Sequence, residues 1–260
     1  MDMGALDTAV VILRCFSEAR PELSFAEIMT ATGMPKSSTS RMLSALREAR
    51  LLEQDEVTRR FRPGLLAFEL GRLYRAHDDL ISRTETALKD VCARTGHTGY
   101  IAVLDGCDQL VLRMVPGSNP LRVVSPAGQR GSALATSNGR AMLARLSDAE
   151  ILARLPKPFP KLPRNCPQSP DELFQRIAEI RRTGRSMSDN EAIEGVASQG
   201  FALCSRETSE MIGIAISYAS QATPPDERAH VAREMEAMAR SVGRAIGDAV
   251  WGLETGEQAR

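Results

Sequence analysis

The sequence predicts an α+β protein built from a small helical unit that ends in a β-ribbon and a larger unit in which strands and helices alternate. Three observations carry this prediction. Apolar residues recur at helical spacing over residues 6–50, no proline interrupts residues 65–95, and strand-like runs begin at residue 99. We therefore expect a domain over residues 1–64, a helical linker over 65–80 and a second domain over 81–260.

Composition narrows the class of protein. The 260 residues carry 33 basic and 33 acidic side chains, so any basic surface for nucleic acid must be local. The five cysteines form no CxxC motif and the three histidines lack ligand spacing, so we expect no metal, no cofactor and no disulfide framework. The N-terminus does not read as a secretory signal and no apolar run approaches membrane-spanning length, so we expect a cytoplasmic protein without membrane contacts.

The stretch over residues 23–50 has the pattern of a helix-turn-helix. A first helix leads into a tight turn at Thr32-Gly33-Met34, and a second helix opens at Pro35. The first two turns of that second helix hold small hydroxyl residues, which are poor helix formers but suit phosphates and base edges. The candidate DNA contacts here are Lys36, Ser37, Ser38, Thr39 and Arg41, together with Ser24 as the cap of the preceding helix.

A helix before this stretch and a ribbon after it complete the first unit. Apolar residues share one face of the earlier helix, at Leu6, Val10, Leu13 and Phe16. Short extended pieces around residues 55–58 predict a β-ribbon, or wing, and its basic residues could follow the DNA backbone or enter the minor groove. These wing candidates are Arg59, Arg60 and Arg62. A solvated helix face with capping residues would produce a similar pattern, so charge alone is a weak signal.

The stretch over residues 65–95 predicts one long helix, or two helices broken near His77-Asp78-Asp79. A long helix beside a small DNA-binding unit usually connects it to another part of the chain and often dimerises. The alternative is a helix packed wholly on its own domain.

The remaining sequence predicts a mixed α/β domain, because strand-like and helix-like periods alternate. The domain is expected to begin with a hairpin over residues 100–104 and 110–115, a third strand over 121–124 and a helix capped at Thr136 or Ser137. A proline-rich exposed loop over 156–170 and a helix from 170 to Gly184 should follow. The last expected elements are strands over 200–204 and 212–218 and a final helix opening at Thr223.

Several short motifs follow one another at fixed spacing along the chain. They are Ala5-Leu6-Asp7-Thr8-Ala9 with Ile12-Leu13; Thr32-Gly33-Met34-Pro35-Lys36-Ser37-Ser38-Thr39 with Arg41 and Leu43; Phe61-Arg62-Pro63-Gly64; Ser137-Asn138-Gly139-Arg140-Ala141-Met142-Leu143-Ala144; and Arg181-Arg182-Thr183-Gly184 with Asp189-x-Glu191 and Gly195-Val196. Each motif alone is weak, and their order and spacing together are specific. On these residues the chain resembles the IclR-type family of bacterial transcriptional regulators over almost its whole length.

The resemblance implies a winged helix-turn-helix, a helical linker and a C-terminal effector-binding domain with a GAF-like central sheet. It implies three partners: double-stranded operator DNA, a small-molecule effector that is often an organic or aromatic acid, and further copies of the chain in a homodimer or dimer of dimers. The family's effector pocket lies between the sheet and the start of the Gly-Arg-Ala helix. Carried over, it points to Val123, Ser125, Gly131, Ser137, Asn138, Ser188, Asp189 and Ser198.

The chain also departs from the family in the strand after Gly195-Val196. Where the family usually continues Ala-Ala-Pro-Val, this chain has Ala197-Ser198-Gln199-Gly200-Phe201-Ala202, which affects the expected pocket wall. Glycines usual in the turns near residues 57–59 and 206–210 are missing as well.

Several alternatives stay open. Ser137 could be an ordinary helix cap and Asp189 a turn residue, and Arg122 could either neutralise a carboxylate or face solvent. The chain contains no nucleophile elbow, phosphate loop or dinucleotide fingerprint, so we expect no catalytic residues and no enzyme. The competing hypotheses are a small-molecule enzyme fused to a DNA-binding unit and a redox regulator that uses Cys107 or Cys204.

Overall fold

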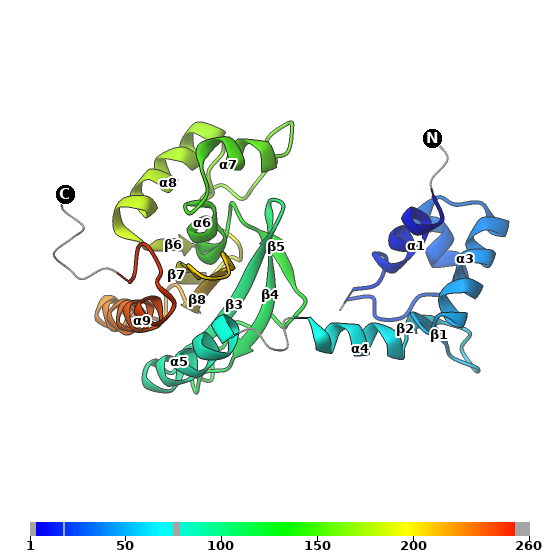
Figure 1. The fold of residues 1–260 in the computed structure, drawn as a ribbon, viewed down its shortest axis with the longest axis horizontal. Helices are drawn as coiled ribbons and strands as arrows, with labels where there is room; N and C mark the ends of the chain where they lie inside the picture. Colours follow the sequence, from blue (N-terminus) through cyan, green and yellow to red (C-terminus); the bar gives the residue numbers. More distant parts are fainter. Residues whose placement is uncertain (1–3, 18, 75–78, 253–260) are drawn as a thin grey trace. The chain divides into compact units, whose positions relative to one another are not determined.

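The computed structural model describes residues 4–17, 19–74 and 79–252. The chain divides into two compact units, residues 1–77 and residues 78–260, which are described separately below (Figure 1). Among the described residues, no helix has both the length and the apolar character needed to span a bilayer.

The first unit is a winged helix-turn-helix, as the sequence predicts. Its elements are α1 (Ala5–Leu13), α2 (Phe25–Thr32), α3 (Lys36–Glu48), β1 (Leu52–Gln54), β2 (Phe61–Pro63) and α4 (Leu65–Leu73). The helices meet in one buried cluster that includes Ile12, Ile28, Leu43, Leu46 and Phe61. The face expected for α1 is wrong in part: Leu13 and Phe16 pack on this cluster, but Leu6 and Val10 are exposed and Ile12 takes the buried position. Because Phe61 comes from β2, the wing is anchored in the same core as the helices.

The turn between α2 and α3 forms where the local sequence favours it. Ser24 and Glu27 make a capping box at the start of α2, in which each side chain bonds the backbone N–H of the other residue. Gly33 ends the helix in the left-handed region at φ +66°, where residues with a Cβ are disfavoured. Pro35 then stands at the N-cap of α3, one residue earlier than the first helical position.

The wing turn forms without the usual glycine. The Asp55 carboxylate accepts hydrogen bonds from the N–H groups of Val57 and Thr58 at 3.0 and 2.7 Å, which folds the turn back on itself. Arg59 takes the left-handed conformation at φ +59°, and β1 and β2 pair antiparallel from Leu52↔Pro63 onward. A hydrogen-bonded aspartate therefore replaces the conformational freedom of a glycine.

The second unit is built on a six-stranded antiparallel sheet with the order β5-β4-β3-β8-β7-β6. The strands are β3 (Thr98–Asp105), β4 (Asp108–Val115), β5 (Arg130–Ser132), β6 (Ser186–Asp189), β7 (Val196–Cys204) and β8 (Met211–Ala219). Helices α5 (Asp79–Thr95) and α9 (Pro225–Ile246) cover one face, and α6 (Ser137–Leu143), α7 (Asp148–Arg154) and α8 (Pro170–Thr183) lie on the other (Figure 1). The names α9 face and α6 face are used for these two sides.

The helix boundaries in this unit follow their sequence signals. Ser169 caps α8 by accepting from the Glu172 N–H, and Gly184 ends it at φ +72°. Pro225 opens α9, whose buried stripe includes Val231, Met235 and Val242. Of the two alternatives for residues 65–95, the described residues show two helices, because α4 ends at Leu73 and α5 begins at Asp79; His77 and Asp78 lie outside the described residues.

One expectation for this unit is wrong, and another is right in position but not in the hydrogen bond it implied. Residues 121–124 form no strand; the chain is irregular from 116 to 129, where Pro120 and Pro126 cannot donate to a ladder, and the strand beside β4 is β5. Neither Thr136 nor Ser137 caps α6 with its side chain. Thr136 occupies the N-cap position but its hydroxyl donates to the Ser132 carbonyl, and Ser137 is already the first helical residue.

Candidate functional site

The exposed face of α3 presents most of the predicted DNA contacts. Lys36, Ser37 and Arg41 are exposed and Ser38 is half-buried. Neither Lys36 nor Arg41 forms an ion pair among the described residues. Thr39 differs, because it is fully buried and its hydroxyl donates to the Pro35 carbonyl at 3.0 Å. Thr39 therefore belongs to the helix core, and Ser40, which is exposed, is the hydroxyl that the prediction left out.

The three wing arginines are not equivalent. Arg60 forms an ion pair with Glu27 at 2.8 Å and donates to the Glu22 carbonyl, and Arg62 forms ion pairs with Glu53 at 2.6 Å and Glu22 at 3.5 Å. The Arg59 side chain, at the tip of the turn, has no hydrogen bond or ion pair among the described residues. Arg59 is therefore the wing cation whose charge is available to a phosphate.

The capping box also fixes the wing against α2. Hydrogen bonding to Ser24, followed by the Arg60 guanidinium, lowers the pKa of Glu27 to about 2, so Glu27 is an anion at neutral pH. One carboxylate thus holds both the start of α2 and a wing arginine. Ser24 already accepts a hydrogen bond from the Glu27 N–H, which leaves only its hydroxyl proton for a phosphate.

Helix α4 presents an apolar surface that its own unit does not cover. None of its residues is buried. Its large exposed apolar side chains, together with the adjoining Tyr74, are Leu65, Phe68, Leu70, Leu73 and Tyr74. Exposed apolar groups at this density mark a surface for contact with another molecule.

A cavity of about 70 Å³ lies on the α6 face of the sheet and brings together five of the eight predicted effector residues. These are Val123, Ser125, Asn138, Ser188 and Ser198. The other lining residues are Tyr100, Gln109, Val111, Thr136, Ala192, Ile193, Val196, Ala215 and Ser217. This space is called the effector cavity below. No charged side chain lines it, so its polar character comes from hydroxyl and amide groups.

Hydrogen bonds order the polar wall of the effector cavity. The hydroxyls of Ser137 and Ser198 lie 2.8 Å apart, and the Asn138 amide donates to Gln109 at 3.1 Å. Ser137 thus supports the wall from behind Ser198, because it is not itself a lining residue. The Tyr100 hydroxyl donates to the Val123 carbonyl, and burial raises the pKa of Tyr100 to about 12, which keeps it a neutral donor.

Gly200 is what lets α6 approach the sheet at this wall. A Cβ on Gly200 would lie 2.8 Å from the Asn138 nitrogen and 2.9 Å from Ser137. Gly213 on the neighbouring strand is equally close to Asn138. Within the segment of β7 that departs from the family pattern, a side chain at position 200 would therefore collide with the N-terminus of α6.

Besides Ser137, two predicted residues lie outside the effector cavity. Gly131 belongs to β5, where the nearest atom to an added Cβ would be the Gln109 amide nitrogen. Asp189 points to the α9 face: it pairs with Ala197 in the sheet, one residue beyond the Ser188↔Ser198 pair. Its carboxylate forms an ion pair with Arg228 at 3.1 Å and accepts from Ser220.

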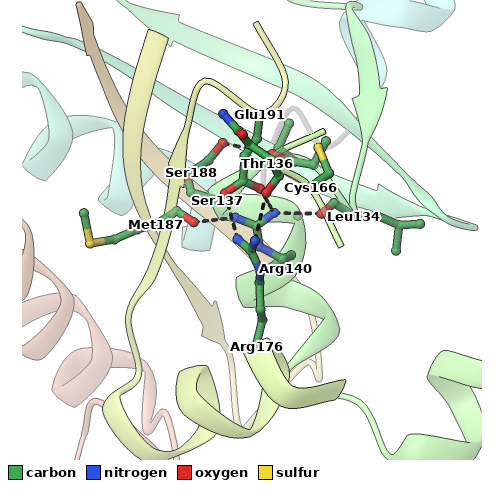
Figure 2. Close-up of polar contacts among 12 residues, drawn as sticks. Leu134, Thr136, Ser137, Arg140, Cys166, Arg176, Met187, Ser188 and Glu191 are labelled. Atoms are coloured by element: carbon green, nitrogen blue, oxygen red, sulfur yellow. Dashed lines mark hydrogen bonds and ion pairs between the residues drawn. The ribbon is translucent and has the colours of Figure 1, made fainter. Parts of the chain in front are cut away.

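A buried ion pair fixes the loop that closes the effector cavity. Figure 2 shows Arg140 of α6 pointing into a group of acceptors, the carbonyls of Leu134 and Met187 and the Glu191 carboxylate. Arg140 Nη1 lies 2.5 Å from Glu191 Oε2, and both side chains are almost fully buried. Burial lowers the pKa of Arg140, and the Glu191 charge opposes that shift. Glu191 directly precedes Ala192 and Ile193, which line the cavity.

The sequence contained this pair without revealing its role. Arg140 and Glu191 both belong to the quoted motifs, but 51 residues separate them and no local pattern links them. The usable signal was Arg140, the one charge in an otherwise uncharged motif, because such a charge is buried only when it is paired.

The cysteines lack the features of a sensor thiol. All five are free, and burial raises the pKa of each, to about 12 for Cys92 and about 11 for Cys107. Since the thiolate is the reactive form, such thiols are weakly nucleophilic at neutral pH. Among the described residues there is also no cluster of three or more metal-ligating side chains.

Comparison with known proteins gives matches along most of the chain. Two family models match it: the IclR helix-turn-helix domain over residues 5–56 and the C-terminal domain of bacterial transcriptional regulators of the IclR type over residues 73–244. The HTH-type transcriptional regulator TtgV of Pseudomonas putida is 31% identical over 191 residues, which cover 73% of this chain and 72% of TtgV.

Solved structures share the fold. An IclR-type regulator from Silicibacter sp. TM1040 superposes with a TM-score of 0.82 at 24% identity, covering 95% of this chain and 97% of that one. An IclR homologue from Microbacterium hydrocarbonoxydans, solved in complex with 4-hydroxybenzoate, has a TM-score of 0.76 at 18% identity and covers 93% of this chain and 100% of its own.

Proposed function

The chain belongs to the IclR family of bacterial transcriptional regulators, and from this premise we propose that it binds operator DNA through α3 and the wing under the control of a small organic or aromatic acid. In this proposal residues 1–64 read DNA, residues 65–80 link the two parts, and residues 81–260 bind the effector. The observation that carries it is the set of unpaired cations on the first unit, Lys36, Arg41 and Arg59, beside exposed hydroxyls on α3.

The DNA contacts divide by chemistry. Lys36 and Arg59 suit phosphates, because each offers a charge that no carboxylate of the described chain neutralises. Arg41, Ser37 and Ser38 stand on the exposed side of α3 and suit base edges in the major groove. Arg60, Arg62 and Ser24 are already bonded within the unit, so we assign them to holding the wing and to secondary phosphate contacts.

The apolar surface of α4 supports a homodimer, or a dimer of dimers, as the DNA-binding form. The five exposed apolar side chains there are what a second copy of the helix would cover. Dimeric helix-turn-helix proteins read two half-sites, which multiplies the affinity of one small recognition helix. Sedimentation velocity tests this: Leu70→Glu with Leu73→Glu on α4 should shift the protein to monomers, and unchanged assembly would contradict it.

The effector cavity suits a small acid held by neutral donors. The solved homologue from Microbacterium hydrocarbonoxydans carries 4-hydroxybenzoate, an aromatic acid. In this chain Asn138 and Ser198 offer amide and hydroxyl groups, and Val123 and Ile193 offer apolar contacts, whereas the Tyr100 proton is already donated to the Val123 carbonyl. At about 70 Å³ the space is smaller than the roughly 150 Å³ cavity that holds benzene, so entry of an aromatic ring requires the Ile193 loop to move outward.

A thermal-shift screen of organic and aromatic acids, followed by DNA binding with each hit, tests the effector part. A true effector raises the unfolding temperature and changes DNA affinity. Ser217→Leu should abolish both effects, because Ser217 lines the cavity and its side chain makes no hydrogen bond among the described residues. Failure of every acid to stabilise the protein would contradict this part of the proposal.

The same reasoning disfavours the competing hypotheses. The relatives that match this chain are named as transcriptional regulators, and we propose that it is a regulator without catalytic activity, acting in the cytoplasm. The raised pKa values of Cys107 and Cys204 argue against a thiol switch.

A further inference from the structure

A second cavity, of about 250 Å³, lies on the α9 face between α9 and the edge of the sheet at β6 and β7. It is called the α9-face cavity here. Six apolar side chains contribute to its lining: Met187, Phe201, Ala229, Ala232, Met235 and Trp251. Alternation along the strands separates it from the effector cavity, because Met187 pairs with Gln199 while Ser188 and Ser198 point to the opposite face.

Its size and walls fit a single aromatic ring. The volume exceeds the roughly 150 Å³ of an apolar cavity known to hold benzene. Phe201 and Trp251 already meet edge to face, with ring centroids 5.7 Å apart, and offer ring surfaces to a further ring. Met187 and Met235 are flexible and polarisable side chains that adapt to an aromatic guest.

The charges at the rim favour an anion. Arg185 and Arg240 both form ion pairs with the single carboxylate of Glu236, which leaves one positive charge uncompensated within that group. The Arg240 guanidinium also lies over the Trp251 ring, 5.8 Å from its centroid. Arg228, the other cation of the lining, is matched by Asp189. The effector cavity has no such charge in its lining.

Trp251 offers a further polar group. Its indole N–H is buried and has no hydrogen-bond acceptor among the described residues. Two glycines leave the space that the Trp251 side chain occupies: a Cβ on Gly184 would lie 2.7 Å from Trp251 Cζ2, and one on Gly243 would lie 2.6 Å from Trp251 Cβ. An unsatisfied buried donor is unfavourable, so an acceptor oxygen brought by a ligand would be stabilising once Trp251 turns to uncover its N–H.

We propose that the α9-face cavity is a second ligand site, separate from the effector cavity, which binds a small aromatic carboxylate. The ring occupies the apolar space beside Phe201 and Met235. The carboxylate lies at the rim, where Arg185 supplies charge; the Trp251 N–H, which is fully covered, becomes a further donor only when that side chain turns. This goes beyond the proposed function, which places one acid on the opposite face of the sheet.

The test uses 4-fluorobenzoate and fluorine NMR with the full-length protein. Ala232→Leu fills the α9-face cavity, Arg185→Gln removes a rim charge, and Ser217→Leu fills the effector cavity as the matched control. We expect binding at the α9-face cavity to persist in Ser217→Leu, to be lost in Ala232→Leu, where at most the effector-cavity site remains, and to weaken at least fivefold in Arg185→Gln. The neutral analogue 4-fluorobenzamide should bind wild type more weakly than the acid does.

Three results would overturn the proposal: no binding to wild type, binding unchanged in Ala232→Leu, or binding lost entirely in Ser217→Leu. The proposal would also be overturned if Ala232→Leu changed the sedimentation coefficient but left ligand binding intact. That result would show that the α9-face cavity makes contacts between copies of the chain. Ala229→Leu, at an exposed position of the same lining, repeats the test if Ala232→Leu fails to fold. The proposed function fails by a different readout, the effect of acids on DNA affinity.

Discussion

Arg140 and Glu191 form a buried ion pair that joins α6 to the loop over the effector cavity, although 51 residues separate them in the sequence. Arg176 of α8 binds the second oxygen of the same carboxylate at 2.8 Å (Figure 2). Three segments of the second unit therefore meet at one carboxylate. Because Ala192 and Ile193 follow Glu191 directly, this contact sets where the cavity wall stands.

Removing the Glu191 charge should destabilise the protein strongly. Glu191→Gln leaves the buried Arg140 guanidinium without a counter-charge, which typically costs about 3–5 kcal/mol of unfolding free energy. Urea denaturation measures this, with Glu194→Gln as control, since Glu194 is an exposed residue of the same loop. Arg176→Gln should cost no more than about 1 kcal/mol, because its side chain is partly exposed. Equal effects of the two glutamate variants would contradict the assigned role.

The wing arginines should differ in their contribution to DNA binding. Arg59→Gln removes an unpaired cation, so affinity should fall for all sequences and the salt dependence should flatten by about 0.9 in the log–log slope. Arg60→Gln should change that slope less, because Arg60 is already paired with Glu27. Fluorescence anisotropy at several salt concentrations measures both, with Arg164→Gln in the second unit as the charge-matched control. Identical slopes for all three variants would rule out the wing contact.

The capping box predicts a pH dependence of the first unit. The pKa of Glu27 is about 2 in the folded chain, below the ordinary value of about 4.3 for glutamate. A lowered folded pKa contributes stability above the ordinary value, and that contribution disappears as the pH falls from about 4.3 through about 2. Carboxyl NMR titration should place Glu27 near 2 and should show a higher value in Ser24→Ala. An unchanged pKa in that variant would refute the role of Ser24.

The thiols should react slowly with a disulfide reagent. Cys204 is only half-buried, but its raised pKa keeps the thiolate fraction low at neutral pH. We expect modification of the native protein to be much slower than after denaturation, and DNA binding to survive mild peroxide. Loss of DNA binding on oxidation, absent in Cys107→Ser or Cys204→Ser, would revive the redox hypothesis.

The sequence predicted the elements that depend on local signals. Helix ends depend on signals within a few residues, such as the capping serines, Gly33 and Gly184. The winged helix-turn-helix and the alternating strands and helices of the second unit could therefore be predicted from the sequence. The strand at 121–124 was wrong because a short apolar run resembles a strand wherever it occurs, while β5 has a polar sequence and exists only through its pairing with β4.

The site was predictable only in part for a similar reason. The resemblance to the family correctly predicted that Asn138, Ser188 and Ser198 line the effector cavity. The face of the sheet on which a strand residue lies depends on the strand register, and in this register Asp189 lies on the opposite face. Thr39 was likewise assigned by residue type, although its helical phase buries it. The α9-face cavity had no sequence signal, because its lining comes from four separate segments of the chain.

The most direct test of the regulatory function measures DNA affinity with and without an acid. Duplexes selected from a random pool by the protein would be titrated by anisotropy, in buffer and in saturating 4-hydroxybenzoate or the best acid of the screen. The account predicts sequence-selective binding whose affinity changes at least fivefold with the acid, about 1 kcal/mol of coupling, in wild type. Ser217→Leu should keep the DNA affinity and lose the response. DNA binding that no acid alters, or that persists fully when Lys36, Arg41 and Arg59 are replaced together, would contradict it.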